Sequence, residues 1–287
     1  MKLYKYTTLD TAVKIIEGKS IHFARMSDFN DPFEGPFPEA PEGLENSEKS
    51  FHSWNLRQDI DENFVILSLT RTPLNLLMWS HYGNAHSGCV VEIDTEKAGF
   101  DSSDLCSVPA DYGDVIYTTS QPNYKSVQQI IDSKIVPYRT FSPENYLAAK
   151  AAFLNKHTSW AYEEEVRIVK YLPVPKDEKR GHHESSGKWD LILKNDYEYK
   201  RHNKSVIRQA DFMNLFHLPP NCITRVITGS KLISMSVAPD WRDLYKSDPS
   251  FNNILHVKTI QSHNIQVDKA TAMTTDRTIA IMSSEKY

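Results

Sequence analysis

The chain has 287 residues, a length that suits one large domain or one and a half. With 40% hydrophobic residues, 24% charged residues and a formal net charge of -4, its composition does not imply a strong general affinity for nucleic acid, and a local basic patch stays possible. No run approaches the roughly 18 apolar residues that span a bilayer, and the amino terminus lacks an apolar signal core. We therefore expect a cytoplasmic protein that is neither exported nor inserted into a membrane.

The three cysteines are Cys89, Cys106 and Cys222. They are widely spaced and odd in number, so they form neither a metal-binding quartet nor a disulfide framework. This pattern favours a reducing compartment.

The first residues predict a strand, a helix and a second strand. Leu3 to Tyr6 is a strand candidate, and Thr7 or Thr8 follows as a helix N-cap. Gly18 is the expected C-terminal cap, and Ser20 to Ala24 returns as a strand. The apolar face of the helix consists of Leu9, Ala12, Val13 and Ile16.

Two contrasting segments follow. The stretch from Ser27 to Gly35 is dense in turn-forming residues, and its proline and Asn-Asp pair predict a rigid turn that presents Phe33 and Glu34. From Pro36 to Glu62 the chain is rich in Pro, Glu, Ser and Asn. We expect this second stretch to be a solvated excursion or lid, because it offers little apolar surface.

The centre of the fold is predicted to be a strand-helix-strand unit. Phe64 to Thr70 has apolar residues on both faces, as a central strand does, and Gly88 to Ile93 is a second buried strand. Between them a helix ends at Gly83-Asn84. One side of this helix carries Leu74, Leu77, Met78 and His81.

The rest of the chain alternates between strands and helices. A strong helix start at Ser142-Pro143-Glu144 begins a helix that ends near His157 and faces inward with Leu147, Ala151 and Leu154. The other expected elements are strands at Val115–Thr118, Glu165–Tyr171 (alternating in and out), Ser205–Ile207 and Ile223–Ile227, a helix at Val127–Val136 and a loop at Pro173–Lys188. The pattern predicts an α+β fold with a mixed, largely antiparallel central sheet flanked by helices. Residues 1–230 would form the main domain, and 231–287 a C-terminal elaboration of it.

The segment Trp160 to Arg167 is the first candidate for chemistry. On an extended backbone Glu163 and Glu165 project from one face and Glu164 from the other. Neighbouring acids raise each other's proton affinity unless a cation intervenes, and Arg167 shares their face. This arrangement suits a sugar hydroxyl or a developing positive charge. The alternative is an exposed acidic edge with Arg167 as a salt-bridge partner.

The segment Met78 to Gly88 is the second candidate. His81 and His86 are possible metal ligands, but a glycine interrupts their spacing and no Cys or Asp completes a set. Packing and hydrogen bonding by His81 is the favoured role, with Tyr82 or His86 lining a pocket wall. Trp79 is otherwise a core residue.

These clusters together resemble a bacterial family known as domain of unknown function 2971. The resemblance covers about residues 1 to 230 and rests on five ordered motifs. They are Tyr4-Lys5-Tyr6, Phe29 to Glu34, Ser68-Leu69, Met78 to Tyr82 with His86 and Gly88, and Trp160 to Arg167.

The order of the motifs is similar to that of the ADP-ribosyltransferase superfamily. In that superfamily a first strand bears a polar residue and is followed by threonine and a helix, a middle strand bears a hydroxyl residue, and a late strand opens with Glu-x-Glu. The resemblance implies an ADP-ribosyltransferase-like fold and NAD as a substrate. Ser68 takes the middle position and Glu165 that of the catalytic acid. Lys5 or Tyr6 stands where such enzymes place His or Arg, which departs from the pattern.

The implied chemistry follows from charge. Cleavage of the glycosidic bond of NAD creates an oxocarbenium-like ribose, which a carboxylate beneath it stabilises. Glu165 would bond the ribose hydroxyl, Glu163 would orient a protein or nucleic-acid acceptor, and Arg167 would hold the glutamates. Tyr82 or Tyr162 would stack on nicotinamide. The resemblance implies a toxin or antiphage effector with no metal. Its catalytic residues would be Glu165, Glu163, Ser68 and Tyr6, and its NAD-binding residues Lys5, Thr7, Asn30, Phe33, Trp79, His81, Tyr82, His86, Tyr162 and Arg167.

Two other interpretations stay open. A ligand-sensing or interaction domain that keeps the fold without turnover predicts that Glu163 and Glu165 are held in salt bridges and that the pocket is shallow. A metal-dependent hydrolase or nuclease requires Asp31, Glu34 or His81 within coordination distance of Glu165.

Overall fold

The computed structural model describes residues 1–31, 33–34, 46–120, 130, 138–172, 206–210, 213–232, 249–273 and 278–283. Contacts divide the chain into two compact units, each assembled from segments that are distant in sequence. Unit 1 comprises Met1–Ser20, Leu69–Ala98 and Pro219–Tyr287, and unit 2 comprises Ile21–Ser68 and Gly99–Leu218.

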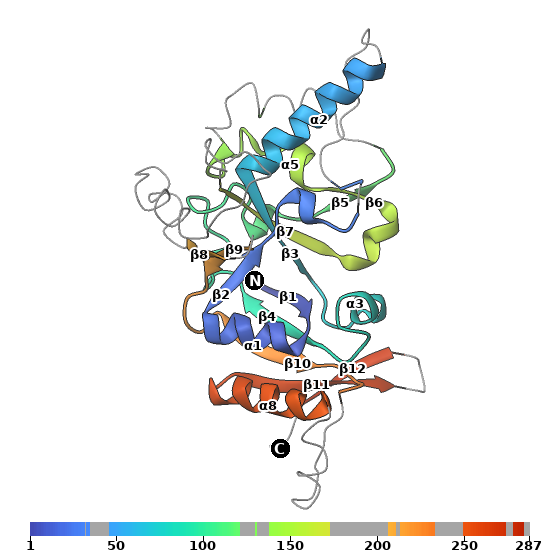
Figure 1. Ribbon diagram of the computed structural model, residues 1–287, viewed down its shortest axis with the longest axis vertical. Helices are drawn as coiled ribbons and strands as arrows, with labels where there is room; N and C mark the ends of the chain where they lie inside the picture. Colours follow the sequence, from blue (N-terminus) through green and yellow to red (C-terminus); the bar gives the residue numbers. More distant parts are fainter. Residues whose placement is uncertain are drawn as a thin grey trace, which may run out of the picture. The chain divides into compact units, whose positions relative to one another are not determined.

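The fold is α+β with a seven-stranded sheet of order β12-β11-β10-β4-β1-β3-β7 (Figure 1). Among the strand pairs whose register is described, β10 and β11 run parallel and the others run antiparallel. The predicted mixed, largely antiparallel sheet with helices is therefore confirmed.

Unit 1 contains five strands and three helices among its described residues: β1 (Lys2–Thr7), α1 (Leu9–Gly18), α3 (Leu76–His81), β4 (Cys89–Asp94), β10 (Ile223–Thr228), α8 (Pro249–Ser262), β11 (Gln266–Met273) and β12 (Thr278–Ser283). Helix α1 packs against α8 and β4, and α8 packs against β11. As predicted, Thr8 caps α1, and its hydroxyl accepts a hydrogen bond from the Thr11 N–H. The predicted cap at Gly18 is one residue early, since Gly18 is still helical and Lys19 takes the left-handed conformation.

Unit 2 contains most of β2 (Ser20–Phe23) and of β3 (Phe64–Thr70), together with η1 (Met26–Asp28), α2 (Asn46–Asn63), η2 (Ala110–Tyr112), β5 (Ile116–Thr118), α5 (Tyr146–Phe153), β6 (Asn155–His157), η4 (Thr158–Glu163), β7 (Glu165–Tyr171), β8 (Val206–Ala210) and β9 (Met213–His217). Besides the large sheet, β2, β9 and β8 form a three-stranded sheet, and β5 pairs parallel with β6.

Residues 46–63 form helix α2, where the sequence predicts a solvated excursion. Ile60, near the end of α2, is fully buried in a core cluster that also contains Phe64, Phe153 and Val169. The composition of the segment is polar, but its last turn has a tertiary packing partner. Residues 36–45 of the predicted lid lie outside the described residues.

Helix α5 differs from its prediction in its start, its end and part of its buried face, although Leu154, just after the helix, is buried as predicted. It begins at Tyr146 rather than at Ser142, and it ends at Phe153 rather than near His157. Leu147, predicted to face inward, is 75% exposed. The buried residues of the helix are Ala148, Ala149, Ala152 and Phe153. With only eight residues, the helix has too few turns for apolar spacing to define its face.

Helix α3 is also rotated relative to its prediction. Met78 and Trp79 are buried, while Leu74, Leu77 and His81 are exposed. The indole of Trp79 is completely buried and donates a hydrogen bond to the Pro73 carbonyl. The large aromatic ring therefore sets the orientation of this six-residue helix.

Two other predicted elements lie outside the described residues: the loop Pro173–Lys188, and the helix Val127–Val136 apart from Ile130. The strands predicted near Ile207 and Ile227 are present as β8 and β10. Within the described part of the chain, no helix is both long and apolar enough to cross a membrane.

Candidate functional site

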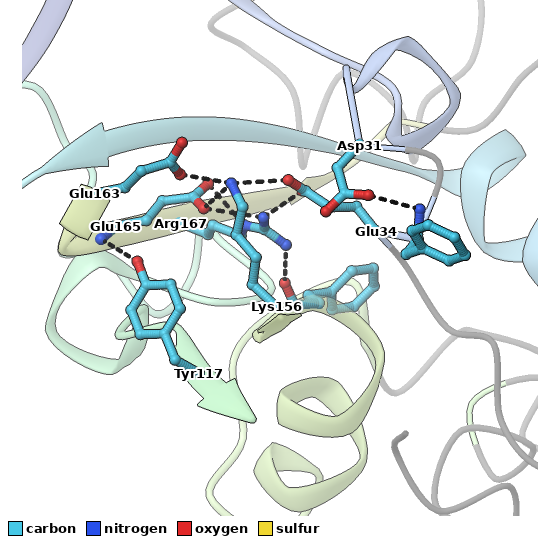
Figure 2. A network of polar contacts seen from close by, with 9 residues as sticks. Asp31, Glu34, Tyr117, Lys156, Glu163, Glu165 and Arg167 are labelled. Carbon is cyan, nitrogen blue, oxygen red and sulfur yellow. Dashed lines mark hydrogen bonds and ion pairs between the residues drawn. The ribbon is translucent and has the colours of Figure 1, made fainter. Parts of the chain in front are cut away.

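The candidate site is built on the first half of β7, in unit 2 (Figure 2). Glu165 and Arg167 lie two residues apart on this strand, so both side chains leave the same face. The first six residues of β7 are all buried, which contradicts the predicted in-and-out alternation. Both faces of β7 are covered, and the interpretation as an exposed acidic edge is therefore wrong.

The three successive glutamates are not extended as predicted. Glu163 ends η4, Glu164 has a left-handed φ of 45°, and Glu165 begins β7. This change of direction leaves Glu163 and Glu165 buried and Glu164 exposed. The predicted division of the three side chains is confirmed, although a turn rather than an extended backbone produces it.

Lys156, on β6, is the common partner of three carboxylates. Its Nζ lies 2.8 Å from Glu34 Oε1, 2.5 Å from Glu163 Oε2 and 3.1 Å from Glu165 Oε2. Figure 2 shows the ammonium group among the three acids. The aromatic ring of Trp160 lies beneath it, with its centroid 5.1 Å from Nζ. These contacts account for a lysine that is only 7% exposed.

Arg167 is the second cation and has no exposed surface. Its Nε and Nη2 donate to the two oxygens of Glu165, at 2.8 and 3.0 Å, in a bidentate pair. Nη2 also donates to Glu34 Oε2 at 2.5 Å, and Nη1 donates to the Phe153 carbonyl at 2.8 Å. Glu34 thus bridges the two cations, with one oxygen on Lys156 and the other on Arg167.

Two hydroxyl groups complete the surroundings of Glu165. Ser68 lies on the neighbouring strand β3, and its hydroxyl helps to lower the pKa of the Glu165 carboxyl. Tyr117, on β5, accepts a hydrogen bond from the backbone N–H of Glu165 at 2.8 Å. This hydrogen bond fixes the backbone where β7 begins.

The charges in the network do not balance. The network contains three carboxylates and two cations, which leaves a formal charge of about -1. These five buried groups are Glu34, Glu163, Glu165, Lys156 and Arg167. Burial raises the pKa of Glu165, but the charges of Arg167 and Lys156 and the hydrogen bonds from Arg167 and Ser68 outweigh it, so the pKa lies below its ordinary value. Burial lowers the pKa of Lys156, and the nearby carboxylates of Glu165 and Glu34 raise it above its ordinary value. Glu165 is therefore ionised at neutral pH.

The turn from Asn30 to Glu34 holds one of these acids in place. Asp31 Oδ1 accepts a hydrogen bond from the Phe33 N–H at 2.9 Å, and the Asp31 carbonyl accepts one from the Glu34 N–H at 3.1 Å. Asn30 is exposed, Phe33 is 72% exposed, and Glu34 is 2% exposed. The predicted turn thus presents Phe33 outward and Glu34 inward.

The predicted site residues of unit 1 form an aromatic cluster. The Tyr6 hydroxyl donates to the Thr72 carbonyl at 3.1 Å and accepts from the Asn75 N–H at 3.2 Å. Tyr6 packs edge-on against Trp79, with ring centroids 5.3 Å apart. His86 stacks nearly parallel to Trp79, with centroids 6.4 Å apart.

An unusual loop positions His86. Asn84, Ala85 and His86 all have positive φ angles, a strained arrangement for three successive non-glycine residues. A Cβ atom added to Gly229 would lie 2.1 Å from the His86 carbonyl oxygen, so only glycine permits this close approach. Burial, followed by the charge of Lys231, lowers the pKa of His86. Its imidazole is consequently neutral at physiological pH.

The structure therefore divides the predicted site residues between the units. Unit 2 brings together Ser68, Glu163, Glu165 and Arg167, and also holds Asn30, Phe33 and Tyr162. Unit 1 holds Lys5, Tyr6, Thr7, Trp79, His81, Tyr82 and His86. His81 is exposed, and its ring lies 6.2 Å from that of Tyr82.

The sequence pattern does not single out Lys156 or Tyr117, and it predicts Glu34 as a residue on a turn or, in the hydrolase interpretation, as a possible metal ligand. Lys156 lies in a segment predicted as the end of a helix, with no motif around it. Two buried acids need more positive charge than Arg167 alone supplies, but their burial is known only from the tertiary structure. The pairing of β5 with β6 then places Lys156 beside them.

For metal binding, Glu34 and Glu165 do approach each other, as the hydrolase interpretation requires. However, the ammonium of Lys156 and the guanidinium of Arg167 occupy the positions between them. Among the described residues, no group of three or more His, Cys, Asp or Glu side chains is arranged to hold a metal ion.

A family model matches part of the chain. It is described as "Protein of unknown function (DUF2971)", and the match covers residues 78–168. That range includes the Trp79 to His86 segment and the whole run from Lys156 to Arg167. The motifs at Tyr4 to Tyr6, Phe29 to Glu34 and Ser68-Leu69 lie outside it. No curated protein and no solved structure matches the chain.

Proposed function

We propose that this chain is an ADP-ribosyltransferase-like enzyme that uses NAD as a substrate. The observation that carries the proposal is the pair of buried carboxylates Glu163 and Glu165, which Lys156 holds side by side at the start of the strand next to that of Ser68. The proposal is also supported by Ser68 and Glu165, both in unit 2, which lie on the neighbouring strands β3 and β7.

The electrostatics of the network suit this chemistry. Departure of nicotinamide leaves positive charge on the ribose, and a site with an excess of one negative charge stabilises that charge. Glu165 is ionised and would bond the ribose hydroxyl, while Glu163 would orient the acceptor. Arg167 fixes the orientation of Glu165 through the bidentate pair. Tyr82 or Tyr162 would stack on nicotinamide, and the acceptor would be a protein or a nucleic acid, as in a toxin or antiphage effector.

A second function is supported by a specific observation. Both oxygens of Glu165 already carry ion pairs, and the residue is only 6% exposed. Saturated, buried acids are the arrangement expected of a ligand-sensing or interaction domain that keeps the fold without turnover. In that case the network serves to fix the Glu34 turn against β7.

The deciding experiment measures NAD binding by calorimetry and nicotinamide release by chromatography on the same preparations. The variants are Glu165→Gln and Glu163→Gln, and the control is Glu164→Gln, an identical change at an exposed neighbour. For the enzyme we expect release by the wild type and by Glu164→Gln. The rate of nicotinamide release should fall at least about 100-fold in Glu165→Gln, because the charge that stabilises the transition state is gone.

Each result has one interpretation. Heat of binding without nicotinamide release by any protein would favour the non-catalytic domain. Release that a chelator abolishes would favour the metal-dependent hydrolase. An equal fall in the rate of nicotinamide release in Glu164→Gln and Glu165→Gln would contradict the assignment of Glu165 as the catalytic acid. Labelled NAD added to a lysate then distinguishes protein from nucleic-acid acceptors.

A further inference from the structure

We propose that Lys156 is a positioning residue that holds the carboxylates of Glu163 and Glu165 side by side. The expected effect of Lys156 on turnover rests on the proposed function. The expected effect of Lys156 on the charge state of the two glutamates is independent of that function.

The contacts of Lys156 are specific to this role. The lysine donates hydrogen bonds to Glu163, on η4, and to Glu165, on β7, and forms an ion pair with Glu34, on the Glu34 turn. Its side chain has 5% of its surface exposed, so water screens these pairs weakly. Arg167 makes two hydrogen bonds to Glu165, whereas the described ion pair of Glu163 is with Lys156. Lys156 therefore links Glu163 to the pair formed by Glu165 and Arg167.

Removing the lysine charge changes the balance of the cluster. Three buried carboxylates would then face Arg167 alone, and neighbouring acids raise each other's proton affinity. We expect one of them to take up a proton at a pH where the wild type keeps it ionised. The other titratable side chains that face this cluster are Tyr117, on β5, and Tyr162, on η4, whose pKa values are raised by burial first and also by the nearby carboxylates.

The sign of the effect on stability follows directly. A carboxyl group whose pKa is raised in the folded state stabilises the fold at low pH, and this contribution is lost as the pH rises through the raised pKa. Lys156→Met should therefore lose stability relative to the wild type as the pH rises from about 5 to about 8. A residue with a merely packing role would produce a difference that does not change with pH.

The test compares Lys156→Met and Lys156→Arg with Lys150→Met as the control. Lys150 lies on the neighbouring helix α5, where its ammonium is 5.7 Å from the ring centroid of Tyr146. Urea denaturation midpoints are measured across the pH range, followed by the pH profile of nicotinamide release. We expect the acidic limb of the Lys156→Met activity profile to move upward by about one pH unit or more. Lys156→Arg should restore the wild-type profile, and Lys150→Met should match the wild type.

A rescue variant keeps the test decisive where Lys156→Met does not fold. Lys156→Met combined with Glu163→Gln removes a cation and an acid together, so this double variant should fold. Its difference in stability from the wild type should no longer depend on pH. Failure of that rescue, or a pH-independent difference in Lys156→Met, would overturn the inference. Absence of nicotinamide release from the wild type would reject the proposed function alone, because the stability measurements need no activity.

Discussion

Arg167 shows how a single residue holds this part of the protein together. Its guanidinium is completely buried, and its donors reach Glu34, Glu165 and the Phe153 carbonyl. These partners come from three segments of unit 2, the turn before residue 35, helix α5 and strand β7. Since the desolvated charge is stable only with all of them in place, the residue couples their positions.

We therefore expect Arg167→Met to destabilise the protein by about 3–5 kcal/mol, because it leaves Glu34 and Glu165 buried with less compensating charge. Arg167→Lys should also be destabilised, since lysine cannot form the bidentate pair. Urea denaturation at neutral pH measures both. The exposed Arg71 provides the control. If Arg71→Met lost as much stability as Arg167→Met, the buried ion pairs of Arg167 would not explain the effect.

At the scale of elements, local signals predicted α1 better than α3 and α5. Local spacing predicted the N-cap Thr8 and three of the four buried apolar residues of α1, namely Leu9, Ala12 and Ile16. The fourth is Ile15, whereas the predicted Val13 is partly exposed. Helix α3 has six residues, and Trp79 sets its buried face. Helix α5 has eight residues, and alanines make up most of its buried face. The buried last turn of α2 likewise depends on core residues that are distant in sequence.

The loop after α3 offers a prediction at this scale. Gly229→Ala should cost about 1–3 kcal/mol or more, because the added methyl group would meet the backbone carbonyl of His86 rather than a flexible side chain. Gly18→Ala is the control, since its nearest neighbour is the Ser20 hydroxyl at 3.2 Å and alanine favours the helix. Thermal denaturation compares the two, and tolerance of Gly229→Ala would mean that the loop is not tightly held.

For the whole molecule, the burial of the cysteines gives a test of both units. Cys89 and Cys222 lie in unit 1 and Cys106 in unit 2, and all three are free and buried. Burial raises the pKa of each thiol, which lowers its reactivity further. A chromogenic disulfide reagent should therefore react slowly with the native protein and with all three thiols after denaturation. A rapid reaction of one thiol in the native state would show that its unit is not packed as described.

The sequence by itself determined the α+β class, most strands, the cap of α1, the turn that presents Glu34, and the pairing of Glu163 and Glu165 on one side. These features depend on residues within a few positions of one another, where local conformation and spacing are sufficient. The tertiary structure alone decided that both acids are buried, that Lys156 and Glu34 join them, and that the predicted site residues fall in two units. The physical reason is that burial and charge compensation depend on contacts between segments up to 133 residues apart, such as Glu34 with Arg167, which no local pattern encodes.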